Sequence, residues 1–187
     1  MRTRILGRFL MAGALLAVAA GAATKDKIVG PQTDAAIARN VRHEILMYPR
    51  YTLWDDISFR VDNGSVEILG AVSQPYKKQD IQRLVQRVPG VASVTNELKV
   101  LPVSFHDDQL RLQVARAIYR DPALSRYALG AVPSIHIIVE NGHVTLTGAV
   151  NSNLEKQVAG MRASTAGLSF GPVDNRLAVD NPPAKKS

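Results

Sequence analysis

An internal repeat constrains the fold of this 187-residue chain more than any other feature. Residues 61–73 and 139–151 align at a constant offset of 78, with seven of 13 positions identical. Upstream, four apolar or helix-ending positions align at an offset of 73: Ile37, Val41, Ile45 and Pro49 with Leu110, Val114, Ile118 and Pro122. The second copy therefore has five extra residues near 123–133. Two homologous units of about 70 residues are the simplest interpretation.

Each copy predicts the order helix, strand, strand, helix, strand. Apolar residues every four positions indicate an amphipathic helix, with Asp34 and Asp107 or Asp108 as its N-cap. Alternating segments around an Asn-Gly pair then indicate a hairpin. We expect turns or strand ends at seven residues: Asn63, Gly64, Gly70, Gly90, Asn141, Gly142 and Gly148.

The fold class that follows is α+β, with two tandem helix-strand-strand-helix-strand units. Each unit is expected to form a three-stranded sheet with two helices on one face. The predicted domains are 34–101 and 107–180, joined by a linker over 102–106. Because this linker is short, we expect the two copies to pack on each other.

The N-terminus has the layout of a secretory signal peptide over 1–23. A basic start precedes an apolar run over 9–20, and small residues allow cleavage after residue 22 or 23. The alternative is a membrane anchor, but the run is shorter than the roughly 20 residues of a span. We predict a periplasmic or secreted protein with no transmembrane span in the mature chain, a flexible segment over 24–33 and a basic disordered tail over 181–187.

Charge and composition exclude several functions. The net charge of +7 lies mostly at the ends, since 34–101 has nine basic and eight acidic residues and 102–180 has seven of each. A nucleic-acid footprint is therefore not expected.

The absence of Cys excludes thiol chemistry and disulfides. No catalytic motif is present, so we predict no enzyme, cofactor or metal site. His136 and His143 are interpreted as exposed residues of one hairpin, and Asp55-Asp56 as a cap or turn.

The repeated hairpin, a basic helix and the segment Val88-Pro89-Gly90-Val91 followed by Val94, Asn96 and Leu98 resemble the BON domain. The second copy departs from this pattern over 166–173. The resemblance implies a non-enzymatic periplasmic α+β module. It further implies phospholipid binding, support of envelope integrity or osmotic stress tolerance, or a periplasmic chaperone activity.

Basic and aromatic residues on the helices form the candidate site. Such a composition is typical of contact with anionic membrane surfaces. The candidates are Arg39, Arg42, His43, Arg50, Tyr51 and Trp54 in the first copy, and Arg116, Arg120, Arg126 and Tyr127 in the second. The alternative is an ordinary solvated helix face with Trp54 in the core. The predicted partner is an anionic phospholipid surface or, as the second hypothesis, an envelope protein.

Overall fold

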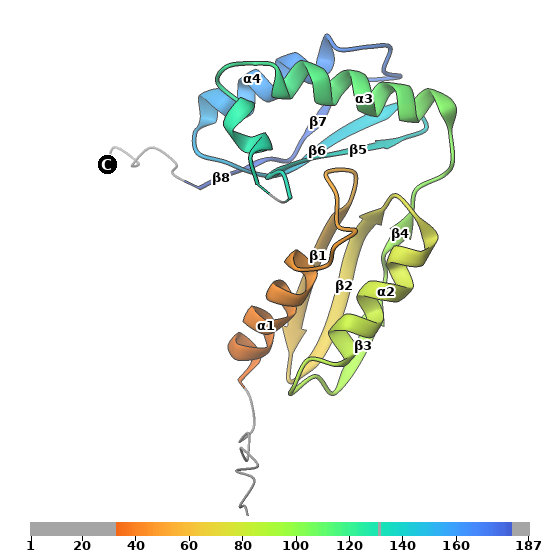
Figure 1. The fold of residues 1–187 in the computed structure, drawn as a ribbon, viewed down its shortest axis with the longest axis vertical. Helices are drawn as coiled ribbons and strands as arrows, with labels where there is room; N and C mark the ends of the chain where they lie inside the picture. Colours follow the sequence, from red (N-terminus) through yellow and green to blue (C-terminus); the bar gives the residue numbers. More distant parts are fainter. Residues whose placement is uncertain (1–32, 131, 181–187) are drawn as a thin grey trace, which may run out of the picture. The chain divides into compact units, whose positions relative to one another are not determined.

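The computed structural model describes residues 33–130 and 132–180 (Figure 1). The predicted signal peptide, segment 24–32 and the C-terminal tail lie outside these residues. The first repeat consists of α1 (Asp34–Leu46), β1 (Asp56–Asp62), β2 (Ser65–Val72), α2 (Pro75–Gln86), β3 (Ser93–Asn96) and β4 (Lys99–Val100). The second consists of α3 (Phe105–Tyr119), the 3-10 helix η1 (Ser125–Ala128), β5 (Ile135–Glu140), β6 (His143–Val150), α4 (Asn153–Ser164), β7 (Asp174–Asn175) and β8 (Ala178–Val179).

Each repeat forms a mixed sheet around its second strand. β2 pairs antiparallel with β1 on one side and parallel with β3 and β4 on the other. β6 likewise pairs antiparallel with β5 and parallel with both β7 and β8. The predicted α+β class and the tandem arrangement are confirmed. The last strand of each repeat, expected to be continuous, is instead split in two.

An asparagine causes this split in each repeat. The side-chain amide of Asn96 donates to the Lys78 carbonyl at 2.8 Å, and its oxygen accepts from the Leu98 amide at 3.1 Å. Asn175 makes the same two bonds, to Lys156 and Leu177. These bonds interrupt the ladder at Leu98 and Leu177, although the preceding amides of Glu97 and Arg176 still donate to the carbonyls of Ile68 and Leu146 at 2.8 Å. The following leucine, Leu98 or Leu177, is thereby turned into the core, where it is almost completely buried.

Each repeat has its own hydrophobic core between its sheet and its two helices. The stripe Ile37, Val41 and Ile45 packs on Ile68 of β2 and Ile81 of α2. The second core is built in the same way from the following residues: Leu110, Val114, Ile118, Leu146 and Ala159. No helix within 33–130 and 132–180 is long and apolar enough to cross a membrane.

A carboxylate ties the first helix of each repeat to its hairpin. Asp107 accepts hydrogen bonds from the amides of Asn141 and Gly142, both at 2.8 Å. Asp34 accepts from Asn63 and Gly64 at 2.8 and 2.9 Å. These bonds suit the tight turn, because Asn63 and Gly64 have φ of 49° and 76°. All seven residues expected at turns or strand ends have positive φ.

The predicted N-cap role of Asp34 and Asp107 is therefore wrong. The caps are Thr33 and Ser104, whose hydroxyls accept from the amides of Ala36 and Asp107. Each cap is a hydroxyl residue just before the helix, which frees the carboxylate inside the first turn to reach the hairpin.

Replacing Asp107 with Ala should lower the free energy of unfolding by about 3 kcal/mol, because the buried Gly142 amide and the partly buried Asn141 amide lose a charged acceptor. Urea titration of the mature protein measures this loss. The matched control is Asp174→Ala in the same repeat, since Asp174 is exposed and pairs with the exposed Arg176. It should cost less than about 1 kcal/mol. Equal losses in the two variants would contradict the proposed clamp.

Candidate functional site

A loop of the first repeat docks on the second. Both repeats belong to a single compact unit of the chain. The Leu53 carbonyl accepts from the Ile137 amide of β5 at 2.8 Å. The Tyr51 ring stacks on His136 with centroids 5.3 Å apart. Leu53 and Trp54 pack against the second hydrophobic core. Tyr51 and Trp54, two predicted membrane contacts, are therefore half-buried at this junction.

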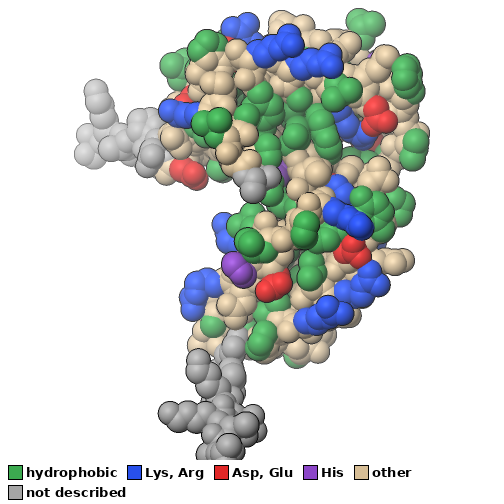
Figure 2. Space-filling model, viewed as in Figure 1, with side chains coloured by type: hydrophobic (Ala, Val, Ile, Leu, Met, Phe, Trp, Pro, Cys, Tyr) green, Lys and Arg blue, Asp and Glu red, His purple; other side chains and the backbone are tan. Residues whose placement is uncertain are grey.

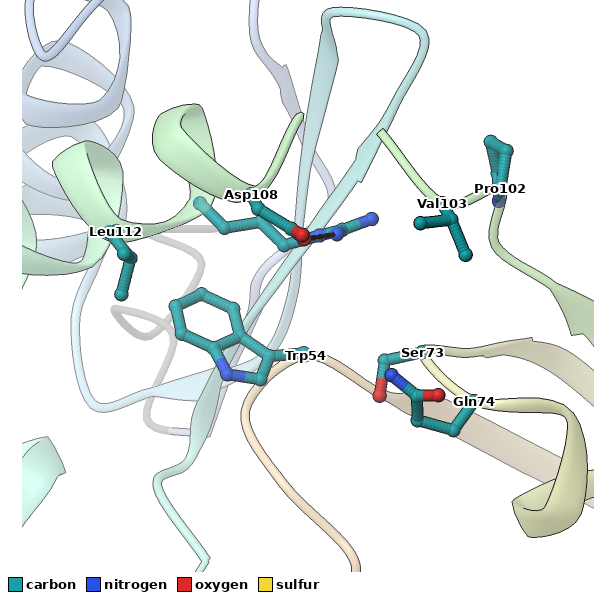
Figure 3. A pocket seen from close by; sticks show the side chains of 8 residues that line it. Trp54, Ser73, Gln74, Pro102, Val103, Asp108 and Leu112 are labelled. Carbon is teal, nitrogen blue, oxygen red and sulfur yellow. Dashed lines mark hydrogen bonds and ion pairs between the residues drawn. The ribbon is translucent and has the colours of Figure 1, made fainter. Parts of the chain in front are cut away.

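The Trp54 indole borders a cavity of about 250 Å³ at the junction (Figure 3). Leu112 of α3 lies across from it, and Gln74 and Val103 complete the rim. Sequence alone left open whether Trp54 is exposed. Its packing against the other repeat gives it an interface role, and we leave it out of the membrane surface proposed below.

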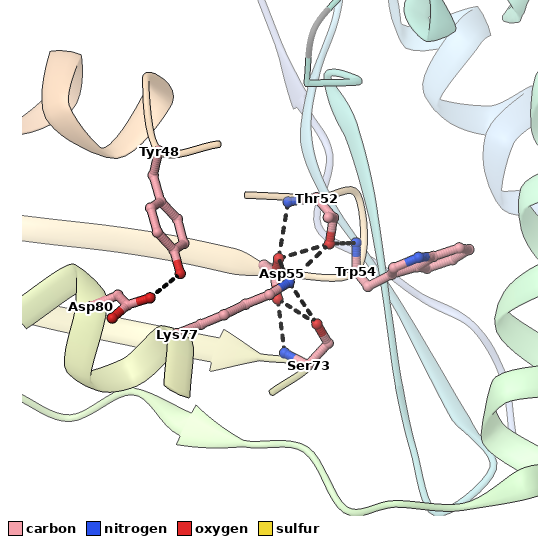
Figure 4. A network of polar contacts seen from close by, with 7 residues as sticks. All are labelled: Tyr48, Thr52, Trp54, Asp55, Ser73, Lys77 and Asp80. Carbon is pink, nitrogen blue, oxygen red and sulfur yellow. Dashed lines mark hydrogen bonds and ion pairs between the residues drawn. The ribbon is translucent and has the colours of Figure 1, made fainter. Parts of the chain in front are cut away.

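A buried polar network braces this loop (Figure 4). The Asp55 side chain is fully buried and accepts from the amide and hydroxyl of Ser73, both at 2.8 Å. It also accepts from the amide and hydroxyl of Thr52 at 2.9 and 2.7 Å. Lys77, itself 4% exposed, forms an ion pair with it at 2.6 Å. Burial opposes ionisation, but Lys77 and these hydrogen bonds outweigh it and lower the pKa of Asp55.

The second repeat builds the equivalent network with the charges exchanged. Glu155 occupies the position of Lys77 at the offset of 78. Arg126 pairs with Glu155, and the Tyr127 hydroxyl donates to it at 3.0 Å while accepting from the Asn151 amide at 2.7 Å. Arg126 and Tyr127, also predicted membrane contacts, are therefore engaged in bracing η1 against α4.

His136 is not exposed, and our interpretation of it was wrong. The loop carrying Tyr51 covers it, so that only 8% of the residue is accessible. Burial lowers the pKa of His136 and favours its neutral form. His143, on the other arm of the hairpin, is exposed as expected. Among the described residues, no group of three or more His, Asp or Glu side chains is arranged to hold a metal.

The remaining candidates lie on exposed helix faces. Arg39, Arg42 and His43 project from α1, and Arg50 follows it, stacked over the Tyr76 ring at 5.1 Å. Arg116 and Arg120 are exposed on α3. Basic and hydrophobic side chains are interspersed on the face shown in Figure 2.

Two residues that we did not predict complete the α1 surface. Leu46 and Met47 are 51% and 65% exposed at the end of α1, next to the basic residues. They fall outside the buried stripe of Ile37, Val41 and Ile45. Their place off this stripe could have indicated from the sequence that these two apolar side chains are exposed. We call Arg39, Arg42, His43, Leu46, Met47 and Arg50 the α1 surface.

A groove of about 540 Å³ runs beside this surface, between α1 and the edge strand β1. Its apolar lining comes from Leu46, Tyr51, Ile57 and Phe59, and Arg39 and Arg42 also border it. We call it the β1 groove. It combines an apolar wall with two cations, a combination that suits a ligand with both apolar and negatively charged parts.

Replacing Lys77 with Met should lower the free energy of unfolding at pH 7 by about 3–5 kcal/mol, because it leaves a buried carboxylate unpaired. The loss should shrink as the pH falls below about 4, where Asp55 becomes protonated in the unfolded chain and then in the folded one. Urea titrations at pH 7 and pH 3 measure both effects. Arg83→Met, at an exposed ion pair, is the control. A loss that is the same at both pH values would contradict the role of Asp55.

Comparisons with known proteins place the chain in a family. A comparison with curated proteins finds no match. Two similar solved structures are of CdsD, a structural protein of the type III secretion system of Chlamydia trachomatis. They share 14% and 15% identity over 76% and 79% of this chain, each with a TM-score of 0.30. The chain spans 60% and 65% of their length. The family model of the BON domain matches twice, over 33–102 and 106–181. With two matches over most of its length, the chain belongs to the BON domain family.

Proposed function

We propose that this protein binds anionic phospholipid surfaces of the cell envelope peripherally, without catalysis, and thereby supports envelope integrity or tolerance of osmotic stress. The observation that carries the proposal is the α1 surface, where basic side chains surround two exposed apolar ones. Membrane-surface helices have this composition, with apolar groups entering the interface and cations facing the headgroups.

The charges of the α1 surface favour weak, salt-sensitive binding. Each basic side chain near an anionic bilayer contributes about 1 kcal/mol. Arg39 and Arg42 have no acidic partner among the described residues, whereas Arg50 lies 4.0 Å from Asp80. Arg39 and Arg42 therefore supply most of the attraction. Leu46 and Met47 add apolar contact that salt does not screen.

A second function, binding of envelope proteins or unfolded chains, is favoured by the β1 groove. This groove places apolar side chains next to the free edge of a sheet. Exposed sheet edges pair readily with extended segments of other chains.

The double variant Arg39→Gln/Arg42→Gln should bind vesicles of phosphatidylglycerol about 30-fold more weakly than the wild type, since it removes two cations worth about 1 kcal/mol each. Sedimentation with vesicles of phosphatidylglycerol and of phosphatidylcholine, at low and high salt, measures this. The matched control is Lys156→Gln/Arg176→Gln in the second repeat, which removes the same charge at residues outside the candidate set and should bind nearly as the wild type does. Wild-type binding by the α1 variant, or equal loss in both variants, would contradict the proposed surface.

A further inference from the structure

The outer edge of the second sheet is partly closed by the chain itself. In an antiparallel pair, every second residue turns its backbone amide and carbonyl away from the partner strand. Ile137, opposite Leu146, is such a residue of β5, since its amide donates away from β6 to Leu53. Ile135 and Val139 therefore face the same way. Three such groups have partners: the Ile135 carbonyl with the Tyr119 hydroxyl at 2.5 Å, the Ile137 amide with the Leu53 carbonyl at 2.8 Å, and the Val139 carbonyl with Arg111 at 2.7 Å. Half of the six outward backbone groups of Ile135, Ile137 and Val139 are thus engaged, and the Leu53-Trp54 loop occupies the middle of this edge.

The first sheet has the same register but lacks all three partners. Phe59 lies opposite Ile68, just as Ile137 lies opposite Leu146. At the offset of 73, Ala38 stands where Arg111 does and Leu46 where Tyr119 does, and neither side chain can donate a hydrogen bond. Within the described residues no segment takes the place of Leu53.

The three equivalent groups of β1 consequently have no hydrogen bond in the described structure: the carbonyls of Ile57 and Val61 and the amide of Phe59. The Phe59 carbonyl and the Val61 amide also face outward without a partner there. A fourth, the Ile57 amide, meets the Tyr51 hydroxyl. The free groups therefore alternate between acceptor and donor from the Ile57 carbonyl to the Val61 carbonyl. An extended peptide backbone offers the complementary alternation.

The side chains of the β1 groove indicate how its occupant differs from the Leu53-Trp54 loop. Where the loop docks on the second repeat, its Trp54 faces Leu112 of α3, and Ala115 of α3 lies in the same apolar cluster. The equivalent positions in the first repeat are Arg39 and Arg42. An occupant docked in the same way therefore needs an apolar residue in the place of Leu53, followed by a carboxylate in the place of Trp54.

We propose that the β1 groove is a docking site for an extended segment of a partner protein, in which an apolar residue is followed by acidic ones and the backbone adds to the free edge of β1. The docking of the Leu53-Trp54 loop on β5 is the precedent within the same chain. This inference goes beyond membrane binding, although both use Arg39 and Arg42. Peptide and anionic vesicles should therefore compete.

Other occupants fit less well. An acyl chain has neither donors for the free carbonyls nor an acceptor for the Phe59 amide. A second copy of this chain would have to present its own docking loop, which is already held by β5, or the loop of its second repeat, which carries Arg126 and would meet two like charges.

The test uses the full mature protein and two labelled peptides, Ac-TTLEEVT-amide and Ac-TTLKKVT-amide. The acidic peptide should bind at least about tenfold more tightly by fluorescence anisotropy, because two ion-pair partners replace two like charges. When it is bound, amide hydrogen exchange at Phe59 should slow about tenfold, whereas exchange at Ile137 should not change. Excess phosphatidylglycerol vesicles should displace the peptide.

Charge reversal distinguishes the groove from a general effect of charge. Arg39→Glu/Arg42→Glu should reverse the preference in favour of the lysine peptide, and Arg116→Glu/Arg120→Glu should leave it unchanged. Unchanged exchange at Ile137 shows that each variant is folded. Equal binding of the two peptides, binding without protection of Phe59, or protection of Phe59 by micelles of short-chain phosphatidylglycerol but not by peptide would overturn the proposal. Vesicle sedimentation is independent of these readouts, so failure of peptide docking would not be mistaken for failure of lipid binding.

Discussion

An open sheet leaves the outward amides and carbonyls of its edge strands without partners inside the sheet. The two repeats differ in how these groups are satisfied. A small sheet covered by helices on one face has two edges, and an unpaired edge attracts other chains. The outer edge of β5 is partly closed by Arg111 and Tyr119 of the second repeat and by the Leu53 carbonyl of the first. The first repeat has Ala38 and Leu46 at the positions of the two side-chain donors. One duplicated fold thus has an engaged edge in the second repeat and an open edge in the first.

The Leu53-Trp54 loop makes this division possible, and it depends on the buried Asp55–Lys77 pair. The loop lies between α1 and β1 and has no regular secondary structure of its own. The four hydrogen bonds that Asp55 accepts from Thr52 and Ser73 fix its course. The carboxylate clamps of Asp34 and Asp107 act in the same way at the opposite end of each hairpin. The hydrogen bonds of these three carboxylates therefore fix the docking loop and both hairpins.

Much of this fold could be predicted from sequence, because its elements are set locally. The stripes of Ile37 and Leu110 and the Asn-Gly turns indicate helix and hairpin without tertiary information. The split last strand, the clamp made by Asp107 and the burial of His136 could not be predicted, since each depends on a contact between distant segments. At the candidate site, Arg39 and Arg42 are where the helical pattern placed them. Trp54 and Tyr127, which we expected on a membrane-facing surface, instead pack against the other repeat and bind Glu155 of α4, respectively.

We infer that the two edges differ in the free protein, with the Phe59 amide of β1 open and the Ile137 amide of β5 engaged by Leu53. Amide hydrogen exchange of the unliganded mature protein, followed residue by residue by NMR, tests it most directly. Phe59 and Ile137 occupy equivalent positions, so each serves as the control for the other. We predict that Phe59 exchanges at least about tenfold faster than Ile137, because only the latter donates to another segment. Equal protection of the two amides would contradict the account.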